Sequence, residues 1–258
     1  MSGLNIRHWP GDPDRPALAL HCMMGSAGGW APVAAALAGA VDLRAFDMPG
    51  HGRSDPWQPG PDGTDYHTAV TRLAAAMIER PLDLIGHSFG ATVALRIAVA
   101  APEAIRTLTL IEPVLFAAAP SAEQDALDAR LAALLDEGRD GEAAATFLSA
   151  WNGQELDALP PPIRAQMVRQ IRLVAETGPA LRTDSARILR EGGLESVDAP
   201  VLIVAGGDSP PVIHAIADAL AARLPDVGRA LIPGAGHMAP MTHAAQVAGL
   251  IGANLERG

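Results

Sequence analysis

Residues 82–90 place a serine where its hydroxyl can act as a nucleophile. The apolar run Leu82–Ile85 leads into Gly-His-Ser-Phe-Gly at 86–90, and a helical pattern follows. Strand, Gly-x-Ser-x-Gly and helix in this order predict a nucleophile elbow, a tight turn that lifts the serine Oγ above a sheet. Glycines on both sides let strand and helix approach closely. Ser88 is therefore predicted to be a nucleophile; a structural turn with a capping serine is the alternative.

A serine hydroxyl is a weak nucleophile unless a base takes its proton. The sequence holds eight histidines, and His237 is the one that directly follows the last expected strand, on a Gly-rich loop. His243 falls inside the expected closing helix, and His87 lies beside the serine, where a structural role is expected. We therefore predict that His237 acts as general base and acid.

Two acidic residues compete to orient this histidine. Asp208 follows the strand Val201–Ala205 and a Gly-Gly turn, whereas Glu112 ends the strand Leu108–Ile111. Either would hold the imidazole tautomer and stabilise the imidazolium. We favour Asp208, which could otherwise be a helix cap. Glu112 remains the rival and could instead line the substrate pocket.

Acyl transfer also needs donors for a developing oxyanion. One is expected to be the backbone N–H of Phe89, directly after the nucleophile. The second is expected from the loop 21–26 that follows the first central strand, and we assign it to the N–H of Met23.

The elements that position these residues alternate between strand and helix. Strands are expected at 17–21, 41–46, 82–85, 108–111, 201–204 and 230–232, and helices at 30–37, 66–79, 91–101, 211–223 and 240–256. This alternation predicts an α/β fold with a mostly parallel central sheet covered by helices on both faces.

Residues 116–196 interrupt the alternation with helical spacing alone. Such an insert between two strands predicts a helical cap, or lid, over the carboxyl edge of the sheet, where open α/β sheets bind ligands. The expected organisation is a core domain of residues 1–115 and 197–258 and a cap of residues 116–196.

Composition excludes several functional classes. The chain has 258 residues, one cysteine, 3% aromatic residues and a net charge of −10, and all its basic residues are arginine. One large α/β unit fits this length. The charge and scarce aromatics disfavour nucleic-acid binding, and the absence of lysine excludes Schiff-base chemistry. The arginine bias is typical of high-GC bacterial genes. Neither a signal peptide nor a membrane span is expected, so we predict a cytoplasmic protein of open oligomeric state.

Together these motifs resemble the α/β-hydrolase superfamily, in particular its capped single-domain branch. That branch includes carboxylesterases, enol-lactonases, cofactor-free haloperoxidase-like enzymes and C–C bond hydrolases. The resemblance rests on the loop 21–30, Asp-Met-Pro-Gly-His-Gly-Arg-Ser-Asp at 47–55, the elbow, and 234–240. It implies the order Ser–Asp–His and no cofactor or metal. One departure is Cys22, where the family's oxyanion loop usually has glycine.

The predicted activity is hydrolysis of small to medium carboxylic esters or lactones through an acyl-enzyme on Ser88. C–C hydrolysis or perhydrolysis with the same triad, or ligand binding without catalysis, are the alternatives. The expected partner is a small-molecule substrate, with no nucleic acid or membrane. Met24, Trp30, Glu112 and Met238 are candidate pocket residues. The cap arginines Arg164, Arg169 and Arg172 fit a solvated helix face, or recognition of a carboxylate.

Overall fold

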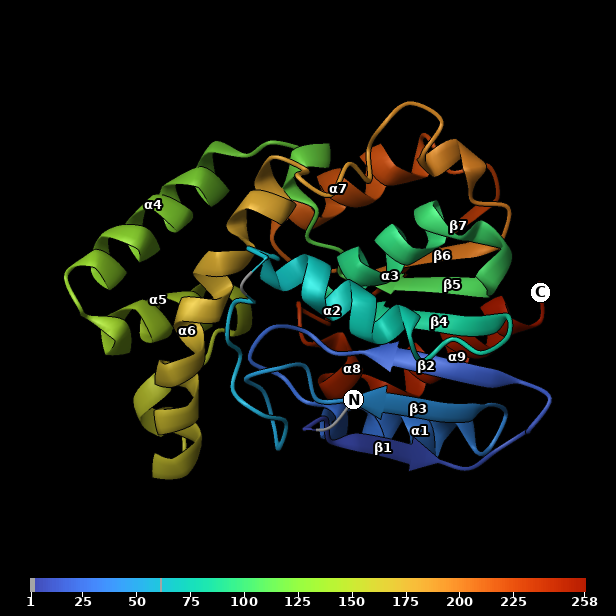
Figure 1. Ribbon diagram of the computed structural model, residues 1–258, viewed down its shortest axis with the longest axis horizontal. Coiled ribbons are helices and arrows are strands. Elements are labelled where there is room, and N and C mark those ends of the chain that lie inside the picture. Colours follow the sequence, from blue (N-terminus) through green and yellow to red (C-terminus); the bar gives the residue numbers. More distant parts are fainter. Residues whose placement is uncertain (1–2, 61) are drawn as a thin grey trace.

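The computed structural model describes residues 3–60 and 62–258, and within them seven strands form one sheet in the order β1-β3-β2-β4-β5-β6-β7 (Figure 1). The strands are β1 Ile6–Trp9, β2 Pro16–Leu20, β3 Asp42–Phe46, β4 Leu82–His87, β5 Ile105–Ile111, β6 Val201–Gly206 and β7 Val227–Ile232. Only β1 pairs antiparallel, with β3, and the other neighbours are parallel. The predicted α/β fold with a mostly parallel sheet is confirmed.

Helices cover both faces of this sheet. They are α1 Ala31–Leu37, α2 Tyr66–Ala75, α3 Phe89–Ala100, α7 Pro211–Ala221, α8 Ala239–Thr242 and α9 Ala244–Leu255. The apolar side chains of α2, α3 and α7 share one core cluster, and those of α1 and α9 share another. Figure 1 shows α2 and α3 in front of the strands and α1 and α9 behind them.

The two core layers follow from alternation along the strands. In β2, Leu18 and Leu20 belong to the cluster under α2 and α3, whereas Ala17 and Ala19 belong to the cluster under α1. Successive side chains of a strand point to opposite faces, so a strand that is buried on both faces must be apolar at every position. The central strand β4 is buried along its whole length.

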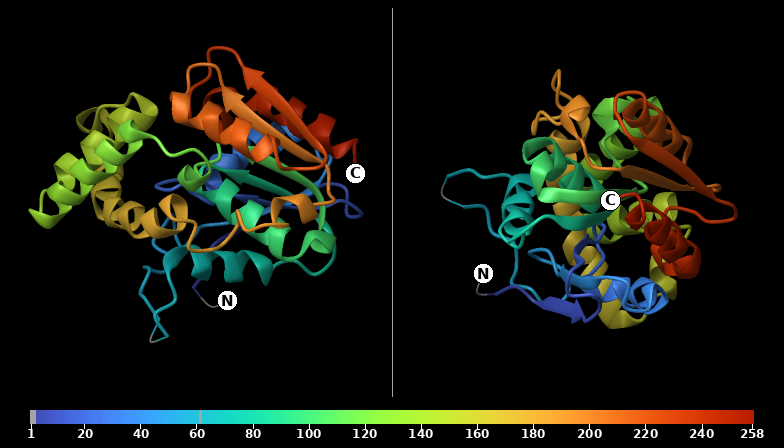
Figure 2. Two further views of the ribbon diagram at one scale, coloured as in Figure 1. Left: turned by 90° about the horizontal axis from the view of Figure 1, so that it is seen from above. Right: turned by 90° about the vertical axis from the view of Figure 1, so that its right-hand side faces the viewer.

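Between β5 and β6, the described segment 116–196 consists of helices joined by loops and contains no strand. Its main helices are α4 Ala122–Asp136, α5 Asp140–Asn152 and α6 Pro161–Arg182, with short 3₁₀ turns at Phe116–Ala118, Leu156–Ala158 and Leu194–Ser196. These helices have a core of their own, in which Leu135, Leu148 and Ile171 pack with Met24 of the main body. Figure 2 shows this cap segment projecting from one edge of the sheet. That this cap segment forms a separate domain stays a prediction.

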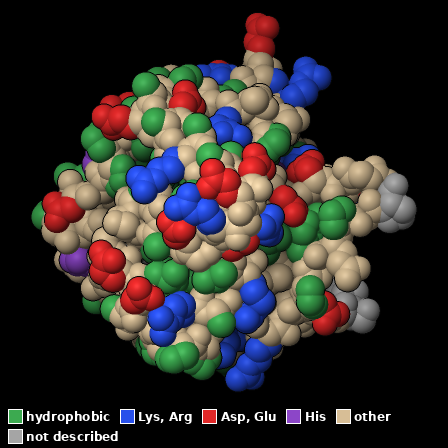
Figure 3. Space-filling view, turned by 90° about the vertical axis from the view of Figure 1, so that its left-hand side faces the viewer, with side chains coloured by type: hydrophobic (Ala, Val, Ile, Leu, Met, Phe, Trp, Pro, Cys, Tyr) green, Lys and Arg blue, Asp and Glu red, His purple; other side chains and the backbone are tan. Residues whose placement is uncertain are grey.

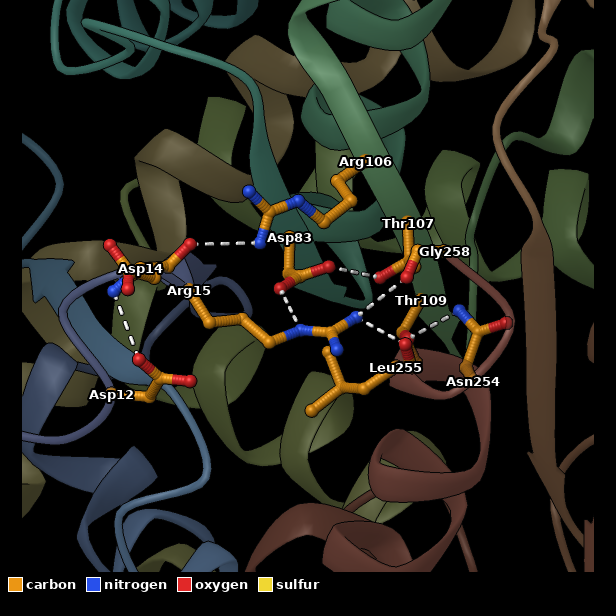
Figure 4. A network of polar contacts seen from close by, with 10 residues as sticks. All are labelled: Asp12, Asp14, Arg15, Asp83, Arg106, Thr107, Thr109, Asn254, Leu255 and Gly258. Atoms are coloured by element: carbon orange, nitrogen blue, oxygen red, sulfur yellow. Dashed lines mark hydrogen bonds and ion pairs between the residues drawn. The ribbon is translucent and has the colours of Figure 1, made fainter.

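A buried polar network lies at the amino end of the strands (Figure 4). The Asp83 carboxylate, fully shielded from solvent, pairs with Arg15 Nε at 3.0 Å and accepts a hydrogen bond from Thr107 Oγ1 at 2.8 Å. Arg15 Nη2 also donates to the carbonyl of Leu255. The network ties the start of β2, β4 and β5 to the end of α9. It lies at the edge of the sheet opposite the carboxyl ends of the parallel strands.

Within the described residues, no helix is both long and apolar enough to cross a membrane.

Candidate active site

Ser88 occupies a strained turn between β4 and α3. Its backbone has φ 56° and ψ −117°, a left-handed φ that costs free energy for a residue with a side chain. A Cβ on Gly86 would collide with the backbone of Gly90 and Ala91, and one on Gly90 would collide with the carbonyl of Leu20. The elbow geometry expected from the sequence is therefore present, and glycine is required at both flanking positions.

His237 reaches this serine from the loop between β7 and α8. Its Nε2 lies 2.9 Å from Ser88 Oγ. The backbone carbonyl of His237 accepts a hydrogen bond of 2.8 Å from His87 Nε2. His87 is completely buried, and its burial lowers its pKa to about 3. A neutral His87 thus anchors the loop that carries His237, which agrees with the structural role expected for His87.

The other ring nitrogen of His237 is bonded to Glu112. Nδ1 lies 3.0 Å from Glu112 Oε2, while Oε1 of the same carboxylate accepts hydrogen bonds from Ser209 Oγ at 2.9 Å and from the Gly206 amide. Burial alone would raise the pKa of Glu112, but the hydrogen bonds from His237, Gly206 and Ser209, together with the attraction of a protonated His237, outweigh it and lower the pKa. Glu112 is therefore held as a carboxylate beneath the imidazole.

The structure corrects the choice of Asp208 as the partner of His237. Asp208 is exposed at the end of β6, and its backbone N–H donates to the carbonyl of Ala235 at 2.9 Å. Strand order explains the difference, because β5 lies directly beside β4 and β6 lies one strand further away. The Ser88 amide donates to the Ile111 carbonyl at 2.8 Å, so the next residue, Glu112, is brought next to the serine.

Met23 and Phe89 both line the cavity that opens at Ser88. Neither amide donates a hydrogen bond to another group of residues 3–60 and 62–258. Both N–H groups therefore keep a free donor, and their role as an oxyanion hole stays a prediction.

Two buried histidines hold the loop that carries Met23. His21 Nε2 accepts a hydrogen bond from the Met48 amide at 2.9 Å, and His51 Nε2 accepts one from the Met24 amide at 3.0 Å. Burial lowers the pKa of His21 to about 4 and that of His51 to about 3. Neutral imidazoles, each using one nitrogen as an acceptor, thus fix the backbone of this loop.

Cys22 occupies the loop position where glycine was expected. Its side chain is buried, and burial raises the pKa of the thiol to about 12. A thiol with such a pKa stays protonated at neutral pH and is a poor nucleophile. Cys22 therefore offers no second nucleophile, although it is among the residues that line a cavity reaching Ser88.

Two cavities meet at Ser88 and His237. The smaller has a volume of about 60 Å³ and the larger of about 300 Å³. Both are lined by Met23, Ser88, Phe147, Trp151 and His237. Most other residues of the larger cavity are apolar side chains from the cap and from the loops beside it.

Two of the four candidate pocket residues line these cavities. Met24 and Met238 face the larger cavity. Trp30 does not, because it is 2% exposed and packs in the core beneath α1 and α9. Glu112 lines neither cavity, since it lies beneath His237.

The cap supplies aromatic residues that the sequence did not single out. The rings of Trp151 and His237 lie 4.6 Å apart between centroids, and Trp151 also packs with Phe116 and Phe147. Phe147 and Trp151 are four residues apart on α5, a spacing that puts them on one helical face. That spacing could have identified the pair, although not its contact with the histidine.

The cap arginines singled out from the sequence lie on the surface. Arg164 pairs with Asp157 at 2.9 Å and Arg172 with Asp140 at 2.6 Å, and Arg169 is exposed. None of the three lines either cavity. Figure 3 shows basic and acidic side chains interspersed over this face of the molecule. They fit a solvated helix face.

Comparison with known proteins agrees with the architecture. The model of the alpha/beta hydrolase family matches residues 17–250. A 2-(acetamidomethylene)succinate hydrolase from Mesorhizobium japonicum is 29% identical over 251 residues, which cover 91% of this chain and 84% of the relative.

Solved structures extend the comparison. A hydrolase from Pseudomonas aeruginosa superposes with a TM-score of 0.74 at 25% identity, covering 98% of this chain and 94% of the other. A bromoperoxidase from Bacillus anthracis gives a TM-score of 0.76 at 19% identity, covering 98% and 95%. The second likeness concerns the fold alone.

Proposed function

Because the chain belongs to the alpha/beta hydrolase family, we propose that it cleaves small to medium carboxylic esters or lactones through an acyl-enzyme on Ser88. One observation carries this proposal. Ser88 Oγ, His237 and Glu112 form a continuous hydrogen-bonded chain of 2.9 Å and 3.0 Å that ends at the cavities. A nucleophile bonded to a base, which is in turn oriented by a third group, is the arrangement that activates a hydroxyl.

In acylation, Ser88 Oγ attacks the ester carbonyl while His237 Nε2 accepts the hydroxyl proton. The carbonyl oxygen becomes an oxyanion, which the amides of Met23 and Phe89 stabilise. The intermediate collapses when the bond between the carbonyl carbon and the leaving oxygen breaks. His237 then gives its proton to that oxygen, and the alcohol departs.

Deacylation repeats these steps with water. His237 takes a proton from a water molecule, and the resulting hydroxide attacks the acyl carbon. The second tetrahedral intermediate breaks its bond to Ser88 Oγ, which regains the proton from His237. The carboxylic acid leaves, so the sum of the two halves is ester plus water giving acid plus alcohol.

Glu112 acts on the imidazole and not on the substrate. Its bond to Nδ1 requires that nitrogen to carry the proton, which leaves Nε2 as the acceptor facing Ser88. The carboxylate also stabilises the imidazolium that forms in each half-reaction. The bonds from Ser209 and Gly206 hold Oε1 so that Oε2 points at the ring.

The cavities favour substrates of modest size. The larger, at about 300 Å³, is at the small end of ligand pockets. Among its lining residues are Met24, Ile163, Met167 and Met238, and methionine adapts to ligands of different shape. An apolar acyl or alcohol group fits this lining.

The test uses p-nitrophenyl acetate and p-nitrophenyl butyrate, with Ser88→Ala as the control. Release of nitrophenol by the wild type, and a loss of several orders of magnitude in the variant, would support the proposal. If neither protein hydrolyses the esters, labelling with a small organophosphonate is measured by mass spectrometry. Absence of both hydrolysis and labelling at Ser88 would refute an acyl-enzyme on this residue.

A further inference from the structure

The lining of the smaller cavity includes a polar cluster contributed by two cap helices. Gln124 and Asp128 lie on α4 and Arg182 ends α6, and all three line the same cavity as Ser88. Gln124 Nε2 donates to Asp128 Oδ1 at 2.9 Å, and Arg182 Nη1 donates to Asp128 Oδ2 at 3.2 Å. The side-chain hydrogen bonds of the cluster do not involve Ser88, His237 or Glu112, and the cluster takes no part in the mechanism above.

Two members of this cluster are shielded from water and the third is partly exposed. Gln124 is 7% exposed, the side chain of Asp128 is 19% exposed, and that of Arg182 is 40% exposed. Burial raises the pKa of Asp128 even though Arg182 opposes that effect. The ion pair carries no net charge, and the remaining lining of this cavity is apolar apart from Thr177 and the residues of the catalytic centre.

Each member of the cluster keeps hydrogen-bonding capacity that its neighbours do not use. Arg182 bonds through Nη1, so Nε and Nη2 remain donors without an acceptor among residues 3–60 and 62–258. Gln124 uses its Nε2, and its Oε1 remains an acceptor. Gly178 leaves the space that the guanidinium occupies, because a Cβ there would lie 2.6 Å from Arg182 Nη2. The lining of the cavity therefore offers both donors and acceptors.

We propose that the smaller cavity receives a substrate arm that ends in an uncharged group able to both donate and accept hydrogen bonds, such as a primary carboxamide, a ureido group or a hydroxyl. This inference rests on the proposed function, since it names the substrate class of the same site. A carboxamide oxygen would accept from Arg182, and its NH₂ would donate to Gln124 or Asp128. The apolar remainder of the substrate would occupy the larger cavity.

Charged ends match the cluster less well. A carboxylate would gain Arg182 but would face the Asp128 carboxylate and the Gln124 carbonyl, which are both acceptors. An ammonium would gain Asp128 but would face the guanidinium. Burying a charge without a complementary partner costs more than burying a hydrogen-bonded neutral group. A methyl end would leave the donors and acceptors of the cluster unpaired.

The test compares esters that differ only in the end of one arm. One series consists of p-nitrophenyl esters whose acyl chains of four to six carbons end in methyl, carboxamide or carboxylate. A second series places the same ends on the alcohol side of butyrate esters, with acid release followed by a pH indicator. We expect the carboxamide to exceed both other ends by about tenfold or more in kcat/KM in one of the series.

The variant Asp128→Asn tests whether the negative charge of Asp128 disfavours a carboxylate end. The substitution keeps the shape of the side chain and leaves the Arg182 charge uncompensated, so the ratio of kcat/KM for carboxylate over carboxamide ends should rise by about tenfold. The matched control is Arg164→Gln, which breaks a surface pair on the same cap but lines no cavity. That variant should keep the wild-type ratio. Circular dichroism checks that both variants fold.

The outcomes separate this inference from the proposed function. Equal rates for the three ends in both series, or an unchanged ratio in Asp128→Asn, would overturn the inference while Ser88-dependent hydrolysis remained. Absence of Ser88-dependent hydrolysis of every ester would overturn the proposed function and this inference with it.

Discussion

The indole of Trp151 lies against the imidazole of His237, with 4.6 Å between the ring centroids, although the two residues are 86 positions apart in the sequence. Trp151 also lines both cavities, so one side chain of the cap touches the histidine and the substrate space at once. The cap therefore contributes to the position of the imidazole as well as covering the site.

Trp151→Leu should lower activity by removing this aromatic contact. An aromatic pair contributes about 0.5–1.5 kcal/mol, which corresponds to a loss of roughly twofold to tenfold in kcat/KM. Trp151→Phe keeps an aromatic ring at this position and should lose less. Steady-state kinetics on p-nitrophenyl butyrate measure both. Equal losses in the two variants would mean that only side-chain volume matters there.

The two candidate acids give opposite expectations. Glu112→Gln should lower kcat by about 10³- to 10⁴-fold, because an amide at Nδ1 favours the wrong imidazole tautomer. Asp208→Asn should stay within about twofold of wild type, since the side chain of Asp208 is exposed and not bonded to His237. The kcat values of the two variants, measured side by side, decide between the acids. A large loss in Asp208→Asn with an active Glu112→Gln would reverse the assignment.

Local patterns predict the central elements and the approach of Ser88 and His237. The elbow depends on residues adjacent in sequence, and the histidine follows a recognisable last strand. The choice between Glu112 and Asp208 depends instead on which strand lies beside β4. That order is a property of the whole sheet, so the sequence leaves both residues as candidates.

One strand and the contacts of the cap with the cavities could not be predicted from the sequence pattern. Strand β1 is missed because Ile6–Trp9 is an edge strand that is mostly exposed, so it carries no apolar alternation. The contacts of Trp151 and Arg182 with the cavities depend on how the cap helices pack against the sheet. Helical spacing identifies a face of each helix but not the partner of that face.

Arg15→Met should destabilise the fold by about 3 kcal/mol or more, because it removes the cation that faces the fully buried carboxylate of Asp83. Asp83→Asn should cost less on the Arg15→Met background than on the wild type, since the unpaired charge is then absent. Arg139→Met, which breaks exposed surface pairs with Glu137 and Glu142, is the control and should leave the urea midpoint almost unchanged. Urea unfolding measures all of these variants. Similar losses of stability in Arg15→Met and Arg139→Met would show that Arg15 does not stabilise the buried Asp83 carboxylate drawn in Figure 4.

Acid should destabilise the protein through its buried histidines. His21, His51 and His67 each use a ring nitrogen as an acceptor, from Met48, Met24 and Arg96 respectively, so protonation must break a hydrogen bond. Burial lowers the pKa of His21 and of His67 from 6.5 to about 4, and that of His51 from 6.5 to about 3.

The lowered pKa values make the folded state less stable as the pH falls. Above pH 6.5 the rings are neutral in both the folded and the unfolded state, and the stability is fully present. As the pH falls below 6.5 the unfolded chain takes up protons that the folded chain resists, so stability is lost down to about pH 4, by up to about 1.4 kcal/mol per pH unit for each histidine. Urea midpoints at pH 7.5, 6.0 and 5.0 should therefore decrease, and His67→Gln should flatten the decrease. A midpoint that stays constant from pH 7.5 to 5.0 would show that these histidines are not held neutral by the fold.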